Sequence, residues 1–166
     1  MGLTHVDRIV ALAVAPKPSG KRLTVPGGRE AVVEFAEVRI GPRRPPAAAF
    51  AVDIPVPGCV DLPGRSLSLS AQTVEGPAAS NGVSAVVAAP DGLLTVRTRR
   101  PGDRVRAKGR DMSLKKFLME RRVPADERAG LPLLATGSRV LWVPGQELEE
   151  ALGARRYVRV RLETRR

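Results

Sequence analysis

The segment RTRRPGDRVRAKGRDMSLKKFLMERRVP, residues 97–124, carries eleven Lys and Arg side chains against three acidic ones. A disordered basic tail would contain few apolar residues and no helical spacing. Here Leu114, Phe117 and Leu118 recur at the spacing of one helix face. Ser113 stands directly before them and is a residue type that caps helices. The sequence therefore predicts that this positive charge is mounted on folded structure.

A tight turn is predicted inside the basic segment, at Arg100-Pro101-Gly102-Asp103. Proline fixes φ at the second position of a type II turn, and glycine supplies the positive φ that the third position needs. The turn would end an alternating strand over residues 92–99. We expect Asp103 to hold a neighbouring arginine, so Pro101, Gly102 and Asp103 are assigned a structural role in the turn and no catalytic one.

Cations on both sides of this turn are candidates for phosphate binding. Guanidinium groups donate paired hydrogen bonds that match the geometry of phosphate oxygens. On a helix that begins after Ser113, Lys115, Lys116 and Arg122 point away from the apolar face. The alternative is an ordinary amphipathic helix with a solvated face, which the adjacent arginine-rich turn disfavours. The candidate binding residues are Arg97, Arg99, Arg100, Arg104, Arg106, Lys108, Arg110, Lys115, Lys116 and Arg122.

Positive charge is concentrated in the second part of the chain. Residues 1–96 hold 9 basic and 8 acidic side chains, whereas residues 97–166 hold 19 basic and 9 acidic ones. Such asymmetry indicates a polyanionic partner, most commonly nucleic acid. The alternative is a solvated surface in a protein from an Arg-rich and Ala-rich proteome. Aromatic residues make up only 3% of the chain, which disfavours recognition by base stacking.

Several classes of catalytic site are excluded by the residues that the chain contains. His5 is the only histidine and Cys59 the only cysteine, so Cys-His, Ser-His and multi-His metal sites are ruled out within these 166 residues. Glu147, Glu149 and Glu150 fall in an expected surface loop. We therefore predict no catalytic, cofactor-binding or metal-binding residues. One cysteine and no apolar stretch of membrane-spanning length fit a cytoplasmic protein without a membrane partner.

The remaining sequence predicts an α+β fold that is mostly β, with short helices. Gly and Pro together account for 31 residues, which favours short strands joined by turns. We expect two domains, residues 1–90 with a helix and β-hairpins, and residues 91–166 with the basic surface. The expected elements are a helix over 4–15, a hairpin over 21–40, strands over 50–56, 66–71, 83–89 and 92–99, a helix over 114–122, a hairpin over 131–143 and a strand over 157–163. Residues 57–65 and 75–82 are expected to be turn-rich breaks.

The order of several segments resembles the C-terminal domain of the tRNA(Ile)-lysidine synthetase family. These segments are LLTVRTRRPGDRVRAKG (93–109), SLKKFLMERRVPADERAGLPLL (113–134) and RVLWVPG (139–145). Upstream, LTHVDRIVALA (3–13), PSGKRLTVPGG (18–28) and IPVPGCVDLPG (54–64) resemble the segments that precede that domain. Two positions depart from the family pattern: Val105 stands where an aromatic residue is common, and Ala107 where proline is common.

The resemblance implies a function. Enzymes of this family use ATP to activate the wobble cytidine of a CAU-anticodon isoleucine tRNA, and the amine of lysine then displaces AMP. That chemistry belongs to an N-terminal ATP-pyrophosphatase domain with an SGG-x-DS loop, a motif that these residues do not contain. The resemblance thus implies a noncatalytic C-terminal portion that binds and orients tRNA, with ATP and magnesium needed only by the complete enzyme.

The resemblance also bears on the fold, because the family's C-terminal domain is similar to a β-rich module of the phenylalanyl-tRNA synthetase β subunit. A short-stranded, β-sandwich-like domain is therefore expected. A free-standing RNA-binding module and a protein-interaction domain that meets an acidic partner stay open as alternative functions. The sequence does not distinguish a fragment, a truncated gene product and half of a split enzyme that pairs with a separate ATP-pyrophosphatase domain. A homodimer stays open too, as do the tRNA elements that would be contacted.

Overall fold

The computed structural model describes residues 3–16, 20–35, 37–43, 45, 47–78, 81–90, 92–149 and 156–165. Over these residues the chain forms thirteen strands and three helices, so the expected mostly-β class of α+β fold is confirmed. The chain divides into two compact units, Met1–Pro46 with Pro124–Asp126, and Ala47–Val123 with Glu127–Arg166. No helix of the described residues is long and apolar enough to cross a membrane.

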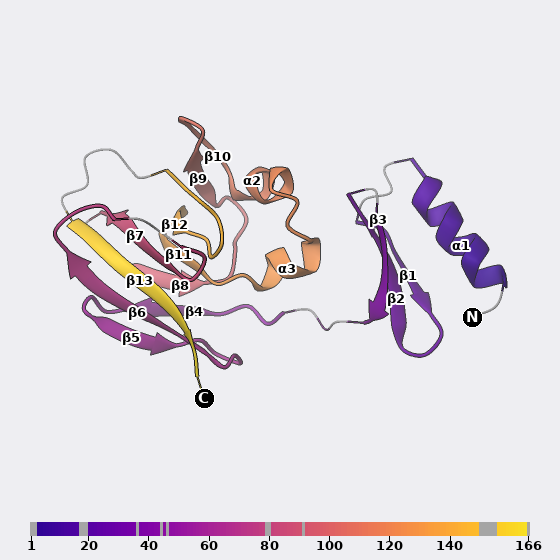
Figure 1. Ribbon diagram of the computed structural model, residues 1–166, viewed down its shortest axis with the longest axis horizontal. Coiled ribbons are helices and arrows are strands. Elements are labelled where there is room, and N and C mark those ends of the chain that lie inside the picture. The colour runs from indigo at the N-terminus through magenta and orange to yellow at the C-terminus, as the bar shows by residue number, and fades with distance from the viewer. Residues whose placement is uncertain are drawn as a thin grey trace. The chain divides into compact units, whose positions relative to one another are not determined.

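The first unit is a helix followed by a three-stranded antiparallel sheet (Figure 1). Its elements are α1 (Leu3–Val14), β1 (Arg22–Val25), β2 (Arg29–Glu34) and β3 (Glu37–Pro42). The expected helix and the hairpin between β1 and β2 are confirmed, and Gly27 and Gly28 supply positive φ in its turn. The sequence run expected as one second strand instead splits into β2 and β3, because Phe35 takes a φ of 50° and turns the chain.

The second unit contains two sheets in which most neighbouring strands are antiparallel (Figure 1). The four-stranded sheet has the order β5 (Gly58–Asp61), β6 (Leu67–Val74), β13 (Arg156–Thr164) and β7 (Ser84–Ala89). The six-stranded sheet has the order β10 (Arg110–Ser113), β9 (Arg104–Ala107), β12 (Arg139–Trp142), β11 (Leu133–Thr136), β8 (Leu94–Arg97) and β4 (Ala51–Ile54).

Apolar side chains from both sheets form one core, as expected for a β-sandwich-like domain. Leu69 and Val158 from the four-stranded sheet join Leu94, Leu134 and Trp142 from the six-stranded sheet in this core. The alternation predicted for the last strand is confirmed, since Val158 and Val160 of β13 are buried in the core, Leu162 packs against it, and Arg159 and Arg161 are exposed.

A second core lies on the other face of the six-stranded sheet, beneath α2 (Leu114–Glu120). Leu133 contributes to this core, whereas its neighbour Leu134 contributes to the first, as successive residues of a strand face opposite sides. Leu114, Phe117 and Leu118 are the buried residues of α2, which confirms the predicted apolar face of this helix. The helix that carries the cations is therefore anchored to the sheet by its buried apolar side chains.

Besides the division into β2 and β3, four features of the fold were not predicted. Residues 58–61, expected as a break, form β5, because Val60 pairs with Leu69 and packs against the sandwich core. β9 and β10 form a hairpin, since Lys108 and Gly109 take φ of 54° and 72° in a two-residue loop. A short helix, α3 (Ala125–Gly130), follows α2. Finally, β4 pairs with β8 and β6 with β13, so strands on either side of residue 91 share sheets in one compact unit.

Candidate nucleic-acid interface

The predicted turn at Arg100–Asp103 is present. Gly102 has a φ of 86°, and the backbone N–H of Asp103 donates a hydrogen bond to the carbonyl oxygen of Arg100 at 3.3 Å. Both features match the type II turn that the sequence predicts. The turn thus connects the end of β8 to the start of β9 and exposes Arg99 and Arg100 on its outside.

A buried ion pair lies beneath the turn. The Arg97 guanidinium donates to both carboxylate oxygens of Asp103, at 2.9 and 2.7 Å, and its side chain and that of Asp103 are each 2% exposed. Arg97 Nη2 also donates to the carbonyl oxygen of Gly137 at 2.9 Å, and the Arg100 N–H donates to Asp103 Oδ2 at 2.7 Å. Asp103 therefore has the structural role expected of it.

This pairing corrects the assignment of Arg97. Its guanidinium is enclosed and its donors are directed to Asp103, Gly137 and the carbonyl oxygen of Thr98, so a phosphate cannot reach it. Sequence reasoning could not separate Arg97 from Arg99, because both are arginines at the end of one strand. Arg97 is the inward-facing residue, and the other nine candidate cations remain.

The turn is tied to the start of α2. The Leu114 N–H donates to the carbonyl oxygen of Asp103 at 2.8 Å, and Ser113 accepts a hydrogen bond from the Lys116 N–H at 3.3 Å. Ser113 is thus the predicted N-cap of the helix. The turn, the β9–β10 hairpin and the first turn of α2 consequently form one connected frame.

Glu149 holds the tip of the β9–β10 hairpin. Its carboxylate accepts the Gly109 N–H at 2.7 and 2.9 Å, and its own N–H donates to the carbonyl oxygen of Arg106 at 3.1 Å. The sequence placed Glu149 in a loop without a role, and nothing local in the sequence indicates a contact over 40 residues. Glu150 lies outside the described residues.

Eight exposed or half-buried cations on this frame, together with Arg122 just beyond the end of α2, form what we call the turn–helix surface: Arg99, Arg100, Arg104, Arg106, Lys108, Arg110, Lys115, Lys116 and Arg122. Some of them have acidic partners. Glu120 lies 3.3 Å from Lys108 Nζ and 4.0 Å from Lys116 Nζ, and Arg106 Nε lies 3.9 Å from Glu149. These pairs are solvent-accessible, so each contributes little to stability.

Other cations of the surface have no such partner. Among the residues that the structure describes, no ion pair joins an acidic side chain to Arg99, Arg100, Arg110, Lys115 or Arg122. The Arg104 guanidinium donates a hydrogen bond to the carbonyl oxygen of Asp111 at 3.5 Å, and no acidic side chain in the described part of the chain forms an ion pair with it. The turn–helix surface therefore presents more positive charge than its acidic neighbours neutralise.

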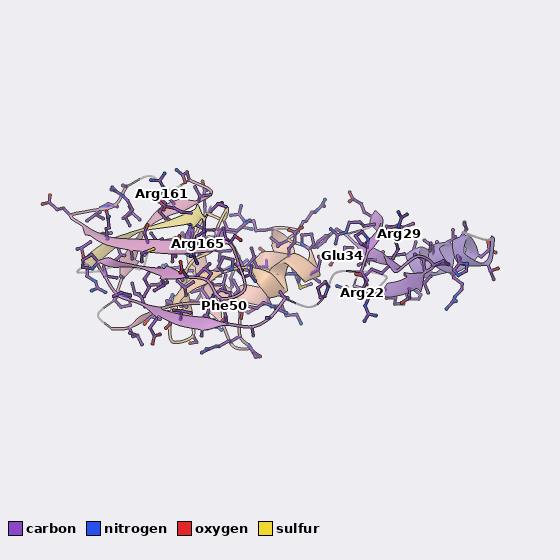
Figure 2. The ribbon with its side chains drawn as sticks, turned by 90° about the horizontal axis from the view of Figure 1, so that it is seen from below. Arg22, Arg29, Glu34, Phe50, Arg161 and Arg165 are labelled. Carbon is purple, nitrogen blue, oxygen red and sulfur yellow. The ribbon has the colours of Figure 1, made fainter. Side chains whose placement is uncertain are left out.

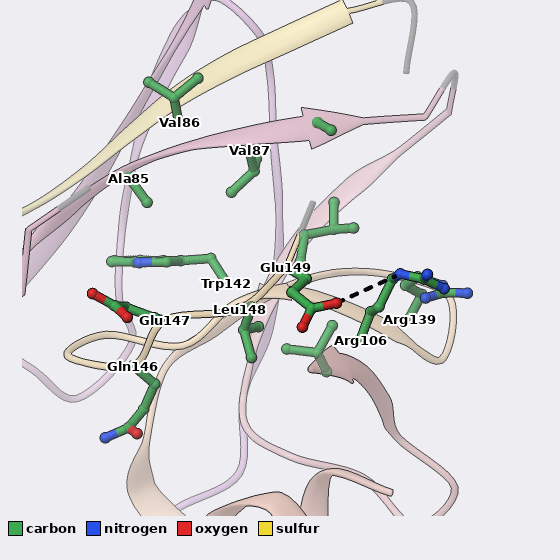
Figure 3. A pocket seen from close by; sticks show the side chains of 13 residues that line it. Ala85, Val86, Val87, Arg106, Arg139, Trp142, Gln146, Glu147, Leu148 and Glu149 are labelled. Carbon is green, nitrogen blue, oxygen red and sulfur yellow. Dashed lines mark ion pairs between the residues drawn. The ribbon is translucent and has the colours of Figure 1, made fainter. Parts of the chain in front are cut away.

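A narrow cleft lies beside this surface, between β7 and the segment that follows β12 (Figure 3). Trp142 and Leu148 line it together with Arg106 and Glu149, whose ion pair crosses the view. Its volume is about 80 Å³, which is too small for a nucleotide. Among the described residues, no group of three or more His, Cys, Asp or Glu side chains could hold a metal ion.

A second basic region lies on the outer face of the four-stranded sheet. Arg159 and Arg161 are exposed there and alternate along the strand with the buried Val158 and Val160 (Figure 2 labels Arg161). Arg161 Nε lies 3.5 Å from a carboxylate oxygen of Glu163, two residues along the same strand. Sequence reasoning recognised this alternation but assigned the region no binding role.

Comparison with known proteins places these features in context. Residues 94–163 match a model of the family described as TilS substrate C-terminal domain. A tRNA(Ile)-lysidine synthase of Symbiobacterium thermophilum is 34% identical over 192 residues, which cover 99% of this chain and 37% of that relative. One of Geobacillus kaustophilus is 28% identical over 153 residues, covering 85% of this chain and 32% of the relative. This chain thus spans about a third of the length of both relatives.

A solved structure supports the same relationship. The crystal structure of a TilS C-terminal domain superimposes with a TM-score of 0.54 and 27% sequence identity. The superposition covers 70% of this chain and 98% of the crystallised one. The fold over most of this chain has therefore been observed before, and the resemblance read from the sequence motifs is confirmed.

Proposed function

We propose a tRNA-binding role for this chain, which belongs to the TilS C-terminal domain family over residues 94–163 and is homologous to tRNA(Ile)-lysidine synthase. The observation that carries the proposal is the turn–helix surface, whose nine cations lie on or next to a frame that a buried ion pair holds in place. Phosphate groups of a folded RNA are the ligands that such a surface fits best.

The contacts would position the tRNA without reading its sequence. Guanidinium and ammonium groups bind the backbone, and backbone contacts fix register and orientation. Base stacking would contribute little, because aromatic residues are scarce and Phe117 lies on the buried face of α2. The surface would thus recognise the shape of a double-stranded stem, as is usual for proteins that bind RNA helices.

In the complete enzyme, this part would hold isoleucine tRNA with a CAU anticodon while lysine is joined to the wobble cytidine. ATP and magnesium would bind to an ATP-pyrophosphatase domain, on the same polypeptide or a separate one, and none of the residues described above would contact them. The reaction would take place in the cytoplasm.

These 166 residues would by themselves be catalytically silent. Incubation with ATP, lysine and the tRNA should therefore leave the cytidine unmodified, which mass spectrometry can measure. Lysidine in that sample would contradict the proposal.

Salt dependence of tRNA binding tests the proposed role directly. Each neutralised phosphate contributes roughly 0.7–0.9 to the slope of log affinity against log salt concentration, so four to six contacts predict a slope of about −3 to −5. Titration of fluorescently labelled tRNA at several salt concentrations measures this slope. Binding that is absent, or that does not change with salt, would overturn the proposal.

A further inference from the structure

A hollow lies between the Arg100–Asp103 turn and the start of α2. It is lined by residues 99–103 and by Ser113, Leu114 and Lys115, and its volume is about 430 Å³. Sites for small ligands have volumes of roughly 300–1,000 Å³, so the hollow has room for a phosphate with part of its ribose. The lining contains no aromatic side chain, which disfavours the stacking of a base in it.

The positive charges around the hollow favour the binding of an anion. Arg99, Arg100 and Lys115 line it, are exposed, and have no ion pair with any residue in the described part of the chain. The one acidic residue of the lining, Asp103, does not neutralise them. Its carboxylate is 2% exposed and is directed to Arg97 and to the Arg100 N–H.

The walls of the hollow are held in place by hydrogen bonds on both sides. The Arg97–Asp103 pair fixes the turn from below, and the Leu114 N–H binds the carbonyl oxygen of Asp103. Ser113 caps the helix that carries Lys115. Because the backbone is ordered before a ligand arrives, only the long cationic side chains would lose freedom on binding.

We propose that this hollow is a discrete site for one phosphate group of an RNA, held by Arg99, Arg100 and Lys115. The inference rests on the proposed tRNA-binding role and sharpens it, because it makes three cations of the turn–helix surface unequal to the others. The phosphate is either a phosphodiester of the backbone or the monoester at a 5′ terminus. Both present the same unesterified oxygens to the two guanidinium groups and the ammonium group.

Paired substitutions of equal charge test the site. Arg99→Gln with Lys115→Gln removes two cations from the hollow, whereas Arg110→Gln with Arg122→Gln removes two exposed cations of the same surface outside it. A hydrogen bond to a charged group contributes enough for the hollow pair to lower tRNA affinity by about tenfold or more. The control pair should lower it by about twofold to fourfold through general electrostatics. Melting temperatures of both variants should match the unsubstituted chain, since all four side chains are exposed.

The outcomes separate the two proposals. Equal losses for both pairs would overturn the discrete site while leaving the tRNA-binding role intact. If neither pair lowered affinity, the tRNA-binding role itself would fail. Transcripts with and without a 5′ phosphate identify the source of the bound group. A monoester in the hollow predicts that removing the 5′ phosphate weakens binding only while Arg99 and Lys115 are present, and a phosphodiester predicts no such change.

Titration of the ¹⁵N-labelled chain with inorganic phosphate gives an independent test. The amide signals of Gly102 and Lys115 should shift and saturate, while the signal of Gly109, at the hairpin tip outside the lining, should stay nearly unchanged. Arg99→Gln with Lys115→Gln should abolish the shifts. Shifts that do not saturate, or that spread evenly over the turn–helix surface, would show that phosphate acts only as a screening ion and would overturn the site.

Discussion

Two regions of the second unit expose arginines, and they are built differently. On β13, the exposure of Arg159 and Arg161 follows from strand alternation alone, because they alternate with the buried Val158 and Val160. At the turn, Arg99 and Arg100 stand on a backbone that a buried carboxylate, a glycine at positive φ and a capped helix hold together. The same residue type therefore gives a general positive charge on β13 and an ordered group of hydrogen-bond donors at the turn.

The largest expected effect concerns the stability of the turn. Asp103→Ala would leave Arg97 buried and unpaired, and loss of one partner of a buried ion pair costs about 3–5 kcal/mol. Asp111→Ala breaks the exposed pair with Arg139 and should cost less than about 1 kcal/mol. Chemical denaturation measures both free energies of unfolding. Equal effects would show that the turn does not depend on the pair beneath it.

Phe117→Ala should destabilise the chain by a similar amount, about 3–5 kcal/mol, because it empties a packed position under α2. The Arg121 guanidinium lies 5.4 Å from the centre of this ring and would lose that contact as well. Lys116→Ala, on the exposed side of the same helix, should leave the melting temperature nearly unchanged. If Phe117→Ala melted at the temperature of the unsubstituted chain, the packing of Phe117 would not be what holds α2 in place.

A smaller loss is expected for Gly102→Ala. Its φ of 86° is unfavourable for any side chain, and the added Cβ meets no atom within 4 Å, so the cost is backbone strain of about 1–2 kcal/mol. Gly82→Ala is the matched control, as that site is open and has no positive φ. Thermal unfolding should separate the two variants. A Gly102→Ala protein as stable as the control would contradict the strained turn.

The smallest effect should appear in tRNA affinity. Glu120→Gln frees Lys108 and Lys116 from their shared acidic partner, and an exposed pair contributes about 0.2–1 kcal/mol, so affinity should rise by about 1.4-fold to fivefold. Glu163→Gln similarly frees Arg161 on β13, where we expect no change. A gain for Glu163→Gln as large as that for Glu120→Gln would mean that the two basic regions bind alike.

Local patterns predicted those parts of the molecule that depend on neighbouring residues. The turn followed from Pro101 and Gly102, the cap from Ser113, and the buried face of α2 from the spacing of its apolar residues. The β9–β10 hairpin could have been found from Lys108-Gly109 between alternating residues, but a lysine at positive φ is a weak signal.

Contacts between distant residues were not predictable in this way. Whether Arg97 or Arg99 faces the core depends on the packing of β8 against β4 and β11. The hydrogen bond from the Gly109 N–H to the Glu149 carboxylate depends on the path of a loop that is 40 residues away in the sequence. Similarly, β5 is a strand because β6 offers it a partner, whereas its own sequence is dominated by turn-forming residues. The candidate residues were therefore identified as a set, and the structure separates the buried member from the exposed ones.

We expect tRNA binding to depend on the arrangement of cations at the turn–helix surface and not on total charge. Arg104→Ala with Lys115→Ala and Arg159→Ala with Arg161→Ala each remove two exposed cations, from the two regions compared above. The measurement is tRNA affinity of both variants over a range of salt concentrations. The first pair should weaken binding by about tenfold or more and flatten the salt slope by about two units, while the second stays within about twofold of the unsubstituted chain. Equal weakening and equal flattening by both pairs would contradict the claim.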